Sequence, residues 1–312
     1  MSNLRQLGER ELIRRLATKL PSRDDVVVGV GDDCAVVKGE GGFDLLYTTD
    51  AVIEGRHFLR ESTPELIGRK AAARALSDIA AMGGEPMHLL VDLVAPPEEK
   101  VERIERVYDG LAKICREHNV AVIGGDTASG TTLELHIFLV GRVPSGRALL
   151  RRGASVGDII YVTGSLGGSV RGKHFEFQPR LAEGRWLREG SWATAMIDVS
   201  DGLATDLRHI TVASGAGAFI DANRIPIAHD VAQLKTSRLP VEHALYDGED
   251  FELLFTVRAE RQRDFEAAWK SNFTLPCHAI GCMQRGAPII QMIDALGVTT
   301  ELSDSGFEHF RS

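Results

Sequence analysis

Hydrophobic positions recur along the chain with two different periods, which predicts a protein that mixes strands and helices. Alternation over residues 133–139 predicts a strand with one buried face. Between Pro64 and Met82, apolar positions recur at helical spacing and place Asp78 on the same inward face as Ile67 and Ala71. Further strands are expected over 26–28, 45–50, 88–94, 120–123, 159–162, 195–199, 218–221, 251–257 and 277–282, and further helices near 12–20, 98–117, 203–213 and 261–269. This order predicts an α/β fold with mixed sheets.

The chain is long enough for two domains, and a change in composition suggests where they meet. Residues 142–153 are rich in arginine in a chain that is otherwise acidic. We therefore expect an N-terminal domain of residues 1–145 and a C-terminal domain of residues 146–312. Both halves repeat a loose pattern of strand, acidic turn and helix, so two related α/β domains are one interpretation.

Apolar runs that lead into an acidic residue recur through the chain. The first is Val26–Val37, where a β-branched run meets Gly-x-Gly and then two aspartates. Two adjacent acids repel each other unless a positive group lies between them, and a divalent metal is the usual solution. Similar runs contain Asp50, Asp78, Asp126, Asp198, Asp201 and Asp247. Together they predict an acidic pocket that binds hard cations through oxygen.

Each of these features also has a structural explanation. A Gly-Asp-Asp sequence taken alone is more often a solvated turn, and either Ser200 or Asp201 suits the N-cap of the helix that follows. Capping does not explain Asp198, which lies in an apolar strand. The glycine-rich segment 164–169 could cradle phosphate, although it matches neither a Walker motif nor G-x-G-x-x-G.

Composition and charge exclude several classes of protein. The 312 residues are 44% hydrophobic and 26% charged, as in ordinary soluble globular proteins. A net charge of −8 argues against a nucleic-acid groove, but not against a phosphorylated small molecule bound through metal ions. The four cysteines lack zinc-site spacing and are expected to be reduced thiols. No secretory leader or membrane-length apolar run is present, so no membrane contact and a cytoplasmic location are expected.

Taken together in this order, the motifs resemble the thiamine-monophosphate kinase family of the aminoimidazole-ribonucleotide-synthetase-like superfamily. The resemblance covers nearly the whole chain, and the full set is specific to the superfamily, whereas His57-Phe58 and Gly306-Phe307 point to this family within it. The segments that carry it are Gly29–Asp33, Thr48–Asp50, Gly55–Phe58, Ser77–Gly83, Gly124–Thr127, Asp198–Leu203 and Asp247–Leu253.

The resemblance implies a magnesium- and ATP-dependent kinase that converts thiamine phosphate to thiamine diphosphate. It also implies a homodimer whose N-terminal domains, which carry the ATP and metal site, associate through their sheets, while the C-terminal domain completes the site. The implied metal ligands are Asp33, Thr48, Thr49, Asp50, Asp78, Asp126, Asp198 and Asp201. ATP would contact Tyr108, Gly125, Asp126, Arg151 and Ser200, and thiamine phosphate would contact His57, Glu249 and Phe307. Asp126, Arg151 and Asp201 would act directly in catalysis.

The chemistry of phosphoryl transfer agrees with this residue set. Such transfer requires in-line positioning and neutralisation of charge more than covalent help. The acceptor is already an anionic phosphate oxygen, so no general base is expected, and Arg151 is the candidate for added cationic stabilisation.

Three alternatives remain open from the sequence. One is another ATP-using member of the superfamily, of the aminoimidazole ribonucleotide or selenophosphate synthetase type. The N-terminal residues 1–21 lack the reactive cysteine and glycine-rich loop typical of the selenophosphate type. Another alternative is a non-catalytic regulator that binds nucleotide or metal. The third concerns single residues, because His57 would also suit a structural loop and Phe307 a hydrophobic core.

Overall fold

The computed structural model describes residues 3–303 and residue 310, and it divides the chain into two compact units. We call residues 33–149 and 172–191 the N-terminal unit, and residues 1–32, 150–171 and 192–312 the C-terminal unit. The main transition, between Leu149 and Leu150, lies close to the boundary expected after residue 145. The segments 1–32 and 172–191, however, each belong to the opposite unit from the one expected.

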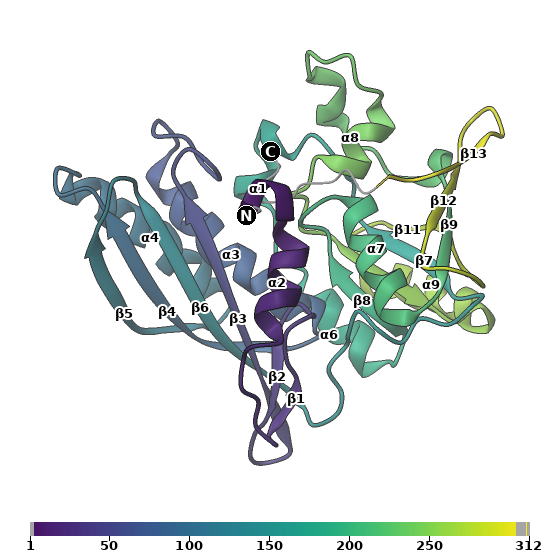
Figure 1. The fold of residues 1–312 in the computed structure, drawn as a ribbon, viewed down its shortest axis with the longest axis horizontal. Coiled ribbons are helices and arrows are strands. Elements are labelled where there is room, and N and C mark those ends of the chain that lie inside the picture. Colours follow the sequence, from purple (N-terminus) through teal and green to yellow (C-terminus); the bar gives the residue numbers. More distant parts are fainter. Residues whose placement is uncertain (1–2, 304–309, 311–312) are drawn as a thin grey trace. The chain divides into compact units, whose positions relative to one another are not determined.

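The N-terminal unit contains a mixed sheet with helices along one face (Figure 1). Its strands are β2 (Ala35–Lys38), β3 (Phe43–Ile53), β6 (Glu134–Pro144), β4 (Glu85–Ala95) and β5 (Ala121–Ser129), in this spatial order. Neighbouring strands are antiparallel, except that β4 and β5 are parallel. The helices are α3 (Pro64–Ala81), α4 (Val101–Glu117), α5 (Lys173–Glu176) and α6 (Leu181–Glu189).

Small residues allow helix α3 to pack closely in this unit. Half of its buried positions are alanine, and it crosses α4 where a glycine of each helix faces the backbone of the other. A Cβ atom on Gly68 would lie 1.8 Å from the carbonyl oxygen of Val107, and one on Gly110 would lie 1.8 Å from that of Glu65. The alternating leucine and isoleucine side chains of β6 are fully buried. The helix that carries Asp78 is thereby fixed against the strand that carries Asp50.

The C-terminal unit is a second, larger sheet with helices α7 (Leu203–Ser214), α8 (Pro240–Tyr246) and α9 (Gln262–Asn272). Its strand order is β13 (Thr299–Glu301), β12 (Ile290–Ile293), β9 (Gly217–Asp221), β11 (Cys277–Gln284), β7 (Ile159–Thr163), β10 (Leu253–Val257) and β8 (Ala193–Asp198). All pairs are antiparallel except β9 and β12. The unit also contains α1 (Leu4–Leu7), α2 (Glu9–Ala17) and β1 (Val26–Val28).

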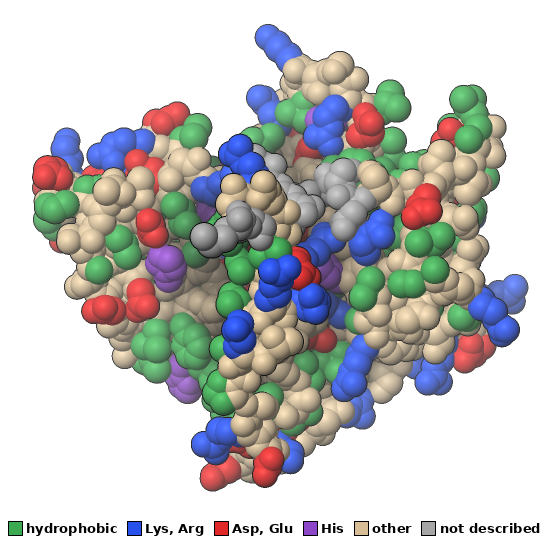
Figure 2. Space-filling view, viewed as in Figure 1, with side chains coloured by type: hydrophobic (Ala, Val, Ile, Leu, Met, Phe, Trp, Pro, Cys, Tyr) green, Lys and Arg blue, Asp and Glu red, His purple; other side chains and the backbone are tan. Residues whose placement is uncertain are grey.

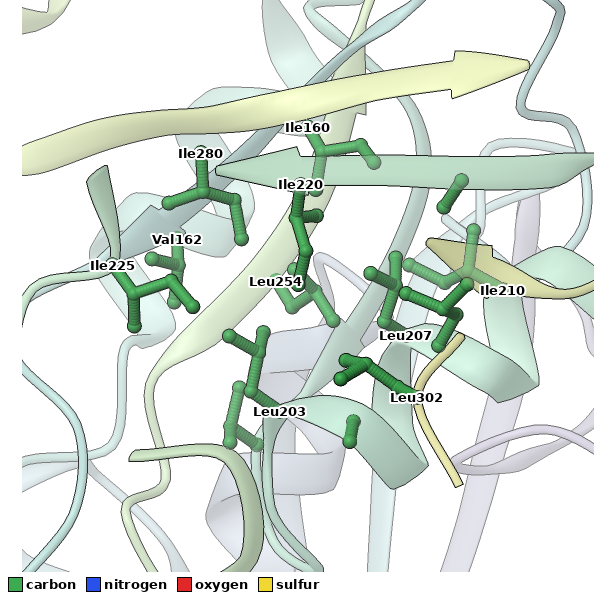
Figure 3. Packing of buried hydrophobic residues seen from close by; sticks show 14 of the residues in the cluster. Ile160, Val162, Leu203, Leu207, Ile210, Ile220, Ile225, Leu254, Ile280 and Leu302 are labelled. Carbon is green, nitrogen blue, oxygen red and sulfur yellow. The ribbon is translucent and has the colours of Figure 1, made fainter. Parts of the chain in front are cut away.

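The core of this unit lies between α7 and one face of the sheet. Leu203, Leu207 and Ile210 follow the i, i+4, i+7 spacing of one helical face and point toward Ile160 and Leu254 (Figure 3). The opposite face of the sheet packs an aromatic cluster against α9, formed by Tyr161, Phe255, Phe265 and Trp269. Because both faces are covered, the acids at the end of β8 are attached to a rigid sheet.

Several expected boundaries were wrong, and two of these errors affect the site. The strand expected to end at Asp50 continues to Ile53, and the strand that begins with the apolar run 120–123, expected to end at Asp126, continues to Ser129. Both continue because polar residues still hydrogen-bond across the sheet, Asp50 lying opposite Ile137 and Asp126 opposite Asp92. Strands β2, β12 and β13 and helix α8 were not predicted, because they are short and carry little periodic pattern. Between residues 3 and 303, no helix is both long and apolar enough to cross a membrane.

Candidate functional site

The two adjacent aspartates of the first motif have different roles. Both carboxylate oxygens of Asp32 accept a hydrogen bond from the backbone N–H of Arg151 at 3.2 Å, within the C-terminal unit. Gly31 has φ = 127°, a conformation that side chains other than glycine rarely adopt. The sharp turn leaves Asp33 in the other unit. Asp32 therefore has a structural partner, and Asp33 remains the candidate ligand.

Three of the expected metal ligands come together in the N-terminal unit. The side chain of Thr48, in the middle of β3, donates a hydrogen bond to Asp78 on α3. The carboxylate oxygens of Asp33 and Asp78 lie within 4.8 Å of one another. Thr49 is exposed and, because side chains alternate along a strand, its side chain does not join this group.

Asp50 lies on the same face as Thr48 and has a cationic partner. Arg74 of α3 donates to its carboxylate at 3.1 Å, and the two side chains are 15% and 22% exposed. Arg74 lies one helical turn before Asp78, so the two side chains lie on the same face of α3. Sequence reasoning missed Arg74, although an arginine on an alanine-rich buried face signals a buried acidic partner.

In this unit, the residues expected to bind nucleotide lie near Asp92, an acid that sequence reasoning also missed. The Asp92 carboxylate accepts the backbone N–H of Asp126 at 3.0 Å. Burial, with a smaller contribution from Asp92, raises the pKa of Tyr108. The pairing of β4 with β5 shifts between Leu89 and Leu90, and this bulge sets which way Asp126 faces. An acid within an apolar strand was the available signal for Asp92, as it was for Asp198.

In the C-terminal unit, acids gather where β8 meets α7. Asp198 ends β8 and is buried. Ligand atoms of Asp201, Asp206 and His209 lie within 4.8 Å of one another, and the carboxylate of Asp206 accepts the backbone N–H of Asp201 at 3.1 Å. Burial, then the negative charges of Asp201 and Asp198, raises the pKa of Asp206 well above its ordinary value. Such crowding favours any cation that binds beside these carboxylates.

The segment around Glu249 is held beside these acids by backbone hydrogen bonds. Glu249 donates its N–H to Ser200 at 2.7 Å, and Phe251 donates to Val199 at 2.8 Å. Glu249 and Phe251 have φ values of 55° and 51°, which are uncommon outside glycine. Strain of this kind persists only where the surroundings impose it and is common at functional sites. The backbone therefore fixes Glu249 next to Ser200.

The expectation that segment 164–169 cradles phosphate was wrong for its central N–H groups. Gly167 donates to the buried carboxylate of Asp250 at 2.9 Å, and Gly168 donates to Asp247 at 3.0 Å. The loop does bind anions, but they are carboxylates of its own chain. Asp247 and Asp250 therefore have structural partners, and Glu249 remains the candidate site residue of this acid-rich run.

The ring of His57 is fixed by the turn that follows β3. The ring Nδ1 accepts the backbone N–H of Ile53 at 3.0 Å, and the backbone N–H of His57 donates to the carbonyl oxygen of Ile53 at 2.9 Å. Because a backbone amide can only donate, neutral His57 carries its proton on Nε2. Phe307, the remaining expected substrate contact, lies outside the described residues.

Similarity to known proteins extends over nearly the full length of the chain. Residues 31–143 match the model of the AIR synthase related protein, N-terminal domain. The chain is 34% identical over 326 residues to a thiamine-monophosphate kinase of Salmonella typhimurium, covering 97% of this chain and 98% of the relative. A relative of the same name from Bacillus subtilis is 32% identical, covering 98% of this chain and the whole relative.

The chain belongs to the thiamine-monophosphate kinase family.

Solved structures of this family share the fold. The structure described as AaThiL complexed with AMPPCP and TMP has 30% sequence identity, a TM-score of 0.86 and 99% coverage of both chains. A thiamine-monophosphate kinase from Stenotrophomonas maltophilia has 34% identity and a TM-score of 0.73, covering 90% of this chain and 95% of its own. Hydrogenase maturation protein HypE in complex with ATP, at 22% identity and a TM-score of 0.71 with 95% coverage of each chain, shares the fold alone.

The donor set of this family member suits magnesium. The gathered side chains offer carboxylate and hydroxyl oxygens, the ligands that small hard divalent ions prefer. The raised pKa of Asp206 and the closeness of Asp33 to Asp78 show that negative charge is concentrated in each unit. A divalent cation would relieve this repulsion, so the residues present fit the metal that the family resemblance implies.

Proposed function

We propose that this protein transfers the γ-phosphoryl group of ATP to thiamine phosphate, forming thiamine diphosphate and ADP. The observation that carries the proposal is full-length similarity to a structure described as complexed with AMPPCP, an analogue of ATP, and TMP. The same activity is named for curated relatives that match over nearly their whole length. Acids lie close together within each unit, Asp33 beside Asp78 in one and Asp201 beside Asp206 in the other, which supports a catalytic rather than a regulatory role.

Magnesium would be held by Asp33, Thr48, Asp50 and Asp78 in the N-terminal unit and by Asp198 and Asp201 in the C-terminal unit. When bound, it would neutralise and orient the phosphates. Asp126 would complete the set, and the hydrogen bond from its backbone N–H to Asp92 would keep its orientation. Thr49 remains a predicted ligand, but its exposed side chain does not support direct coordination.

The remaining residues would bind and orient the two substrates. Tyr108 and Gly125 would contact the nucleotide beside Asp92, and Ser200 would do so from the loop that holds Glu249. Arg151 would add positive charge near the phosphates, since the bond from its backbone to Asp32 fixes the start of its side chain. The acceptor phosphate oxygen is anionic, so this chain needs no side chain to remove a proton.

On the acceptor side, we propose that His57 donates from Nε2 to thiamine phosphate. Glu249 would face its positive charge or the amino group of its pyrimidine ring. Phe307 would stack on the flat cationic ring, an attraction of about 1 kcal/mol or more where water is excluded.

We also propose a homodimer formed through the exposed face of the N-terminal sheet. Strand β5 is exposed along its whole length, and Ile123 and Phe138 are 60% and 38% exposed. Tyr47 and Phe138 stack with ring centroids 6.0 Å apart. Figure 2 shows hydrophobic side chains over this sheet, interrupted by acidic and histidine side chains. Such a face suits a partner of the same chain, and a hydrodynamic mass near twice the 34.0 kDa of one chain would test it.

The decisive experiment measures which products form from magnesium, ATP and thiamine phosphate. ADP and thiamine diphosphate should appear one for one, without free phosphate, and neither should form when thiamine phosphate is omitted. Release of stoichiometric inorganic phosphate with another substrate would instead indicate a synthetase. Asp126→Asn should abolish turnover at limiting magnesium with an almost unchanged melting temperature, because its backbone bond to Asp92 remains. Glu102→Gln, which removes the same charge from an exposed helix position, is the matched control.

A further inference from the structure

A lysine in helix α3 is completely buried and contacts the turn that carries His57. Lys70 is 0% exposed. Its Nζ donates to the carbonyl oxygen of His57 at 2.8 Å and lies 2.7 Å from Nδ1 of His174. The same ammonium lies 5.3 Å from the ring centroid of Phe175. All of these residues belong to the N-terminal unit.

Packing alone does not explain a lysine at this position. Removing an ammonium from water is costly, and a methionine or leucine would fill the same volume without that cost. The cost is offset here by a carbonyl, an imidazole nitrogen and an aromatic face. An ammonium can only donate, so with Lys70 charged the Nδ1 of His174 is the acceptor and the ring proton is on Nε2. The arrangement therefore specifies one geometry of the His57 turn.

The neighbouring arginine provides a contrast on the same helix. Arg69 donates to the carbonyl oxygens of Phe175 and Phe177 at 2.7 and 2.5 Å. It thus attaches the α5 segment to α3, as Lys70 does through His174. Both bonds from Arg69 go to the α5 segment and not to the His57 turn. Removing Arg69 should loosen the α5 segment without removing the bond to the His57 turn.

The far end of the turn is held in a similar way. Arg103 of α4 donates to the carbonyl oxygen of Arg60 at 3.1 Å, and its other nitrogen contacts Glu54 at 3.2 Å and Glu99 at 2.6 Å. Both cations thus bond to backbone of residues 54–60. Of these two cations, Lys70 bonds to His57 itself and Arg103 bonds to the backbone three residues later.

We propose that Lys70, held by His174, is a positioning residue that orients His57 toward the acceptor substrate and so sets the affinity for thiamine phosphate. This inference rests on the proposed function, in which His57 contacts thiamine phosphate. Lys70 acts through the backbone carbonyl of His57 and touches neither substrate. Loss of the bond should therefore weaken the acceptor and leave the nucleotide largely unaffected.

The test compares Lys70→Met, which keeps the length of the side chain but has no donor, with Arg69→Met. Lys70→Met should raise the KM for thiamine phosphate about tenfold or more, because a hydrogen bond from a charged group is lost. The KM for magnesium ATP should stay within about twofold. Arg69→Met should lower the melting temperature without this selective change. Equal KM increases for both substrates in Lys70→Met, or none, would overturn the proposal.

A second pair of variants covers the case in which Lys70→Met does not fold. His174→Leu removes the acceptor for the ammonium, whereas His174→Asn retains an oxygen near the position of Nδ1. His174→Leu should reproduce the selective KM increase, and His174→Asn should recover most of the wild-type value. Similar KM values in the two variants would contradict a positioning role.

Nuclear magnetic resonance of histidines labelled with 15N separates this proposal from the proposed function. His57→Gln assigns the His57 signals, which should report a proton on Nε2 and an acceptor at Nδ1. In Lys70→Met, or in His174→Leu if Lys70→Met does not fold, those signals should shift or broaden even if the protein does not phosphorylate thiamine phosphate. Unchanged His57 signals would refute the positioning role, whereas an inactive wild-type protein with shifted signals in the variant would refute only the proposed function.

Discussion

Two consecutive glycines before Asp126 offer a sharp test of how the fold sets the catalytic geometry. Gly124 and Gly125 have φ values of 151° and 155°, so an alanine at either position is strained to a similar degree, by about 1–3 kcal/mol. The space around them differs. A Cβ on Gly124 would meet Leu90 at 3.5 Å, an ordinary contact, whereas a Cβ on Gly125 would lie 1.8 Å from the carbonyl oxygen of Val91.

The structure gives the size of the displacement. Real Cβ atoms essentially never approach within 3.0 Å, so Gly125→Ala must open the contact by at least 3.0 − 1.8 = 1.2 Å. That movement separates β5 from β4 and moves Asp126, which immediately follows. Misplacement of a reacting group by about 1 Å costs on the order of 100-fold in rate. Overpacking against backbone adds roughly 1–3 kcal/mol of lost stability to the φ strain.

Gly125→Ala should therefore lose about 100-fold or more in kcat, whereas Gly124→Ala should remain within a few fold of the wild type. Formation of thiamine diphosphate at saturating magnesium ATP gives the rates, and thermal unfolding monitored by circular dichroism gives the stabilities. Both variants should melt below the wild type, with Gly125→Ala the lower of the two. If the two alanines reduced kcat equally, close approach of the strands would not determine the position of Asp126.

Three further predictions concern stability and reactivity. Gly110→Ala should lower the free energy of unfolding by about 1–3 kcal/mol or more in urea titrations, because the new Cβ atom would overlap the carbonyl oxygen of Glu65. A change below about 0.5 kcal/mol would contradict the close crossing of α3 and α4. Asp206→Asn should stabilise the metal-free protein in EDTA. Folding raises the pKa of Asp206, so the protein loses stability as the pH rises from 3.8, the ordinary pKa of this group, through the folded pKa. The difference in melting temperature between Asp206→Asn and the wild type should therefore grow between pH 4 and pH 8. A constant difference would refute this cause. Burial raises the pKa of Cys115 from 9.0 to about 11, so the thiolate fraction of Cys115 at pH 8 falls by roughly 100-fold. Iodoacetamide should therefore label Cys115 at least that much more slowly in the folded protein than in urea. Peptide mass spectrometry measures the two labelling rates.

The sequence alone predicted the fold class, which is confirmed, and it supplied most of the residues proposed for the candidate site. Strict alternation in β6 and the helical spacing of α3 were confirmed, because each pattern is produced by burial of one face. The resemblance to the family was confirmed, since its motifs are short local sequences whose order along the chain needs no three-dimensional information. The clustering of Asp78 with Thr48 agrees with the expectation that an acid on a buried helix face has a polar partner.

Other features were decided by contacts between residues distant in sequence. Arg74 and Asp92 were missed because their partners, Asp50 and Asp126, lie 24 and 34 residues away. Strands β3 and β5 continue through their acids because hydrogen bonds across a sheet depend on the partner strand and not on local polarity.

The distinction between functional and structural acids also required the tertiary structure. Asp32, Asp247 and Asp250 follow the same local pattern as the candidate ligands, yet each accepts a backbone N–H from elsewhere in its unit. A backbone donor stabilises each of these three carboxylates without a cation, whereas Asp206, which also accepts one backbone N–H, is crowded by Asp198 and Asp201, whose negative charges raise its pKa. Residue type and spacing are fixed by the sequence, but the donors that reach each oxygen are fixed only when the chain has folded.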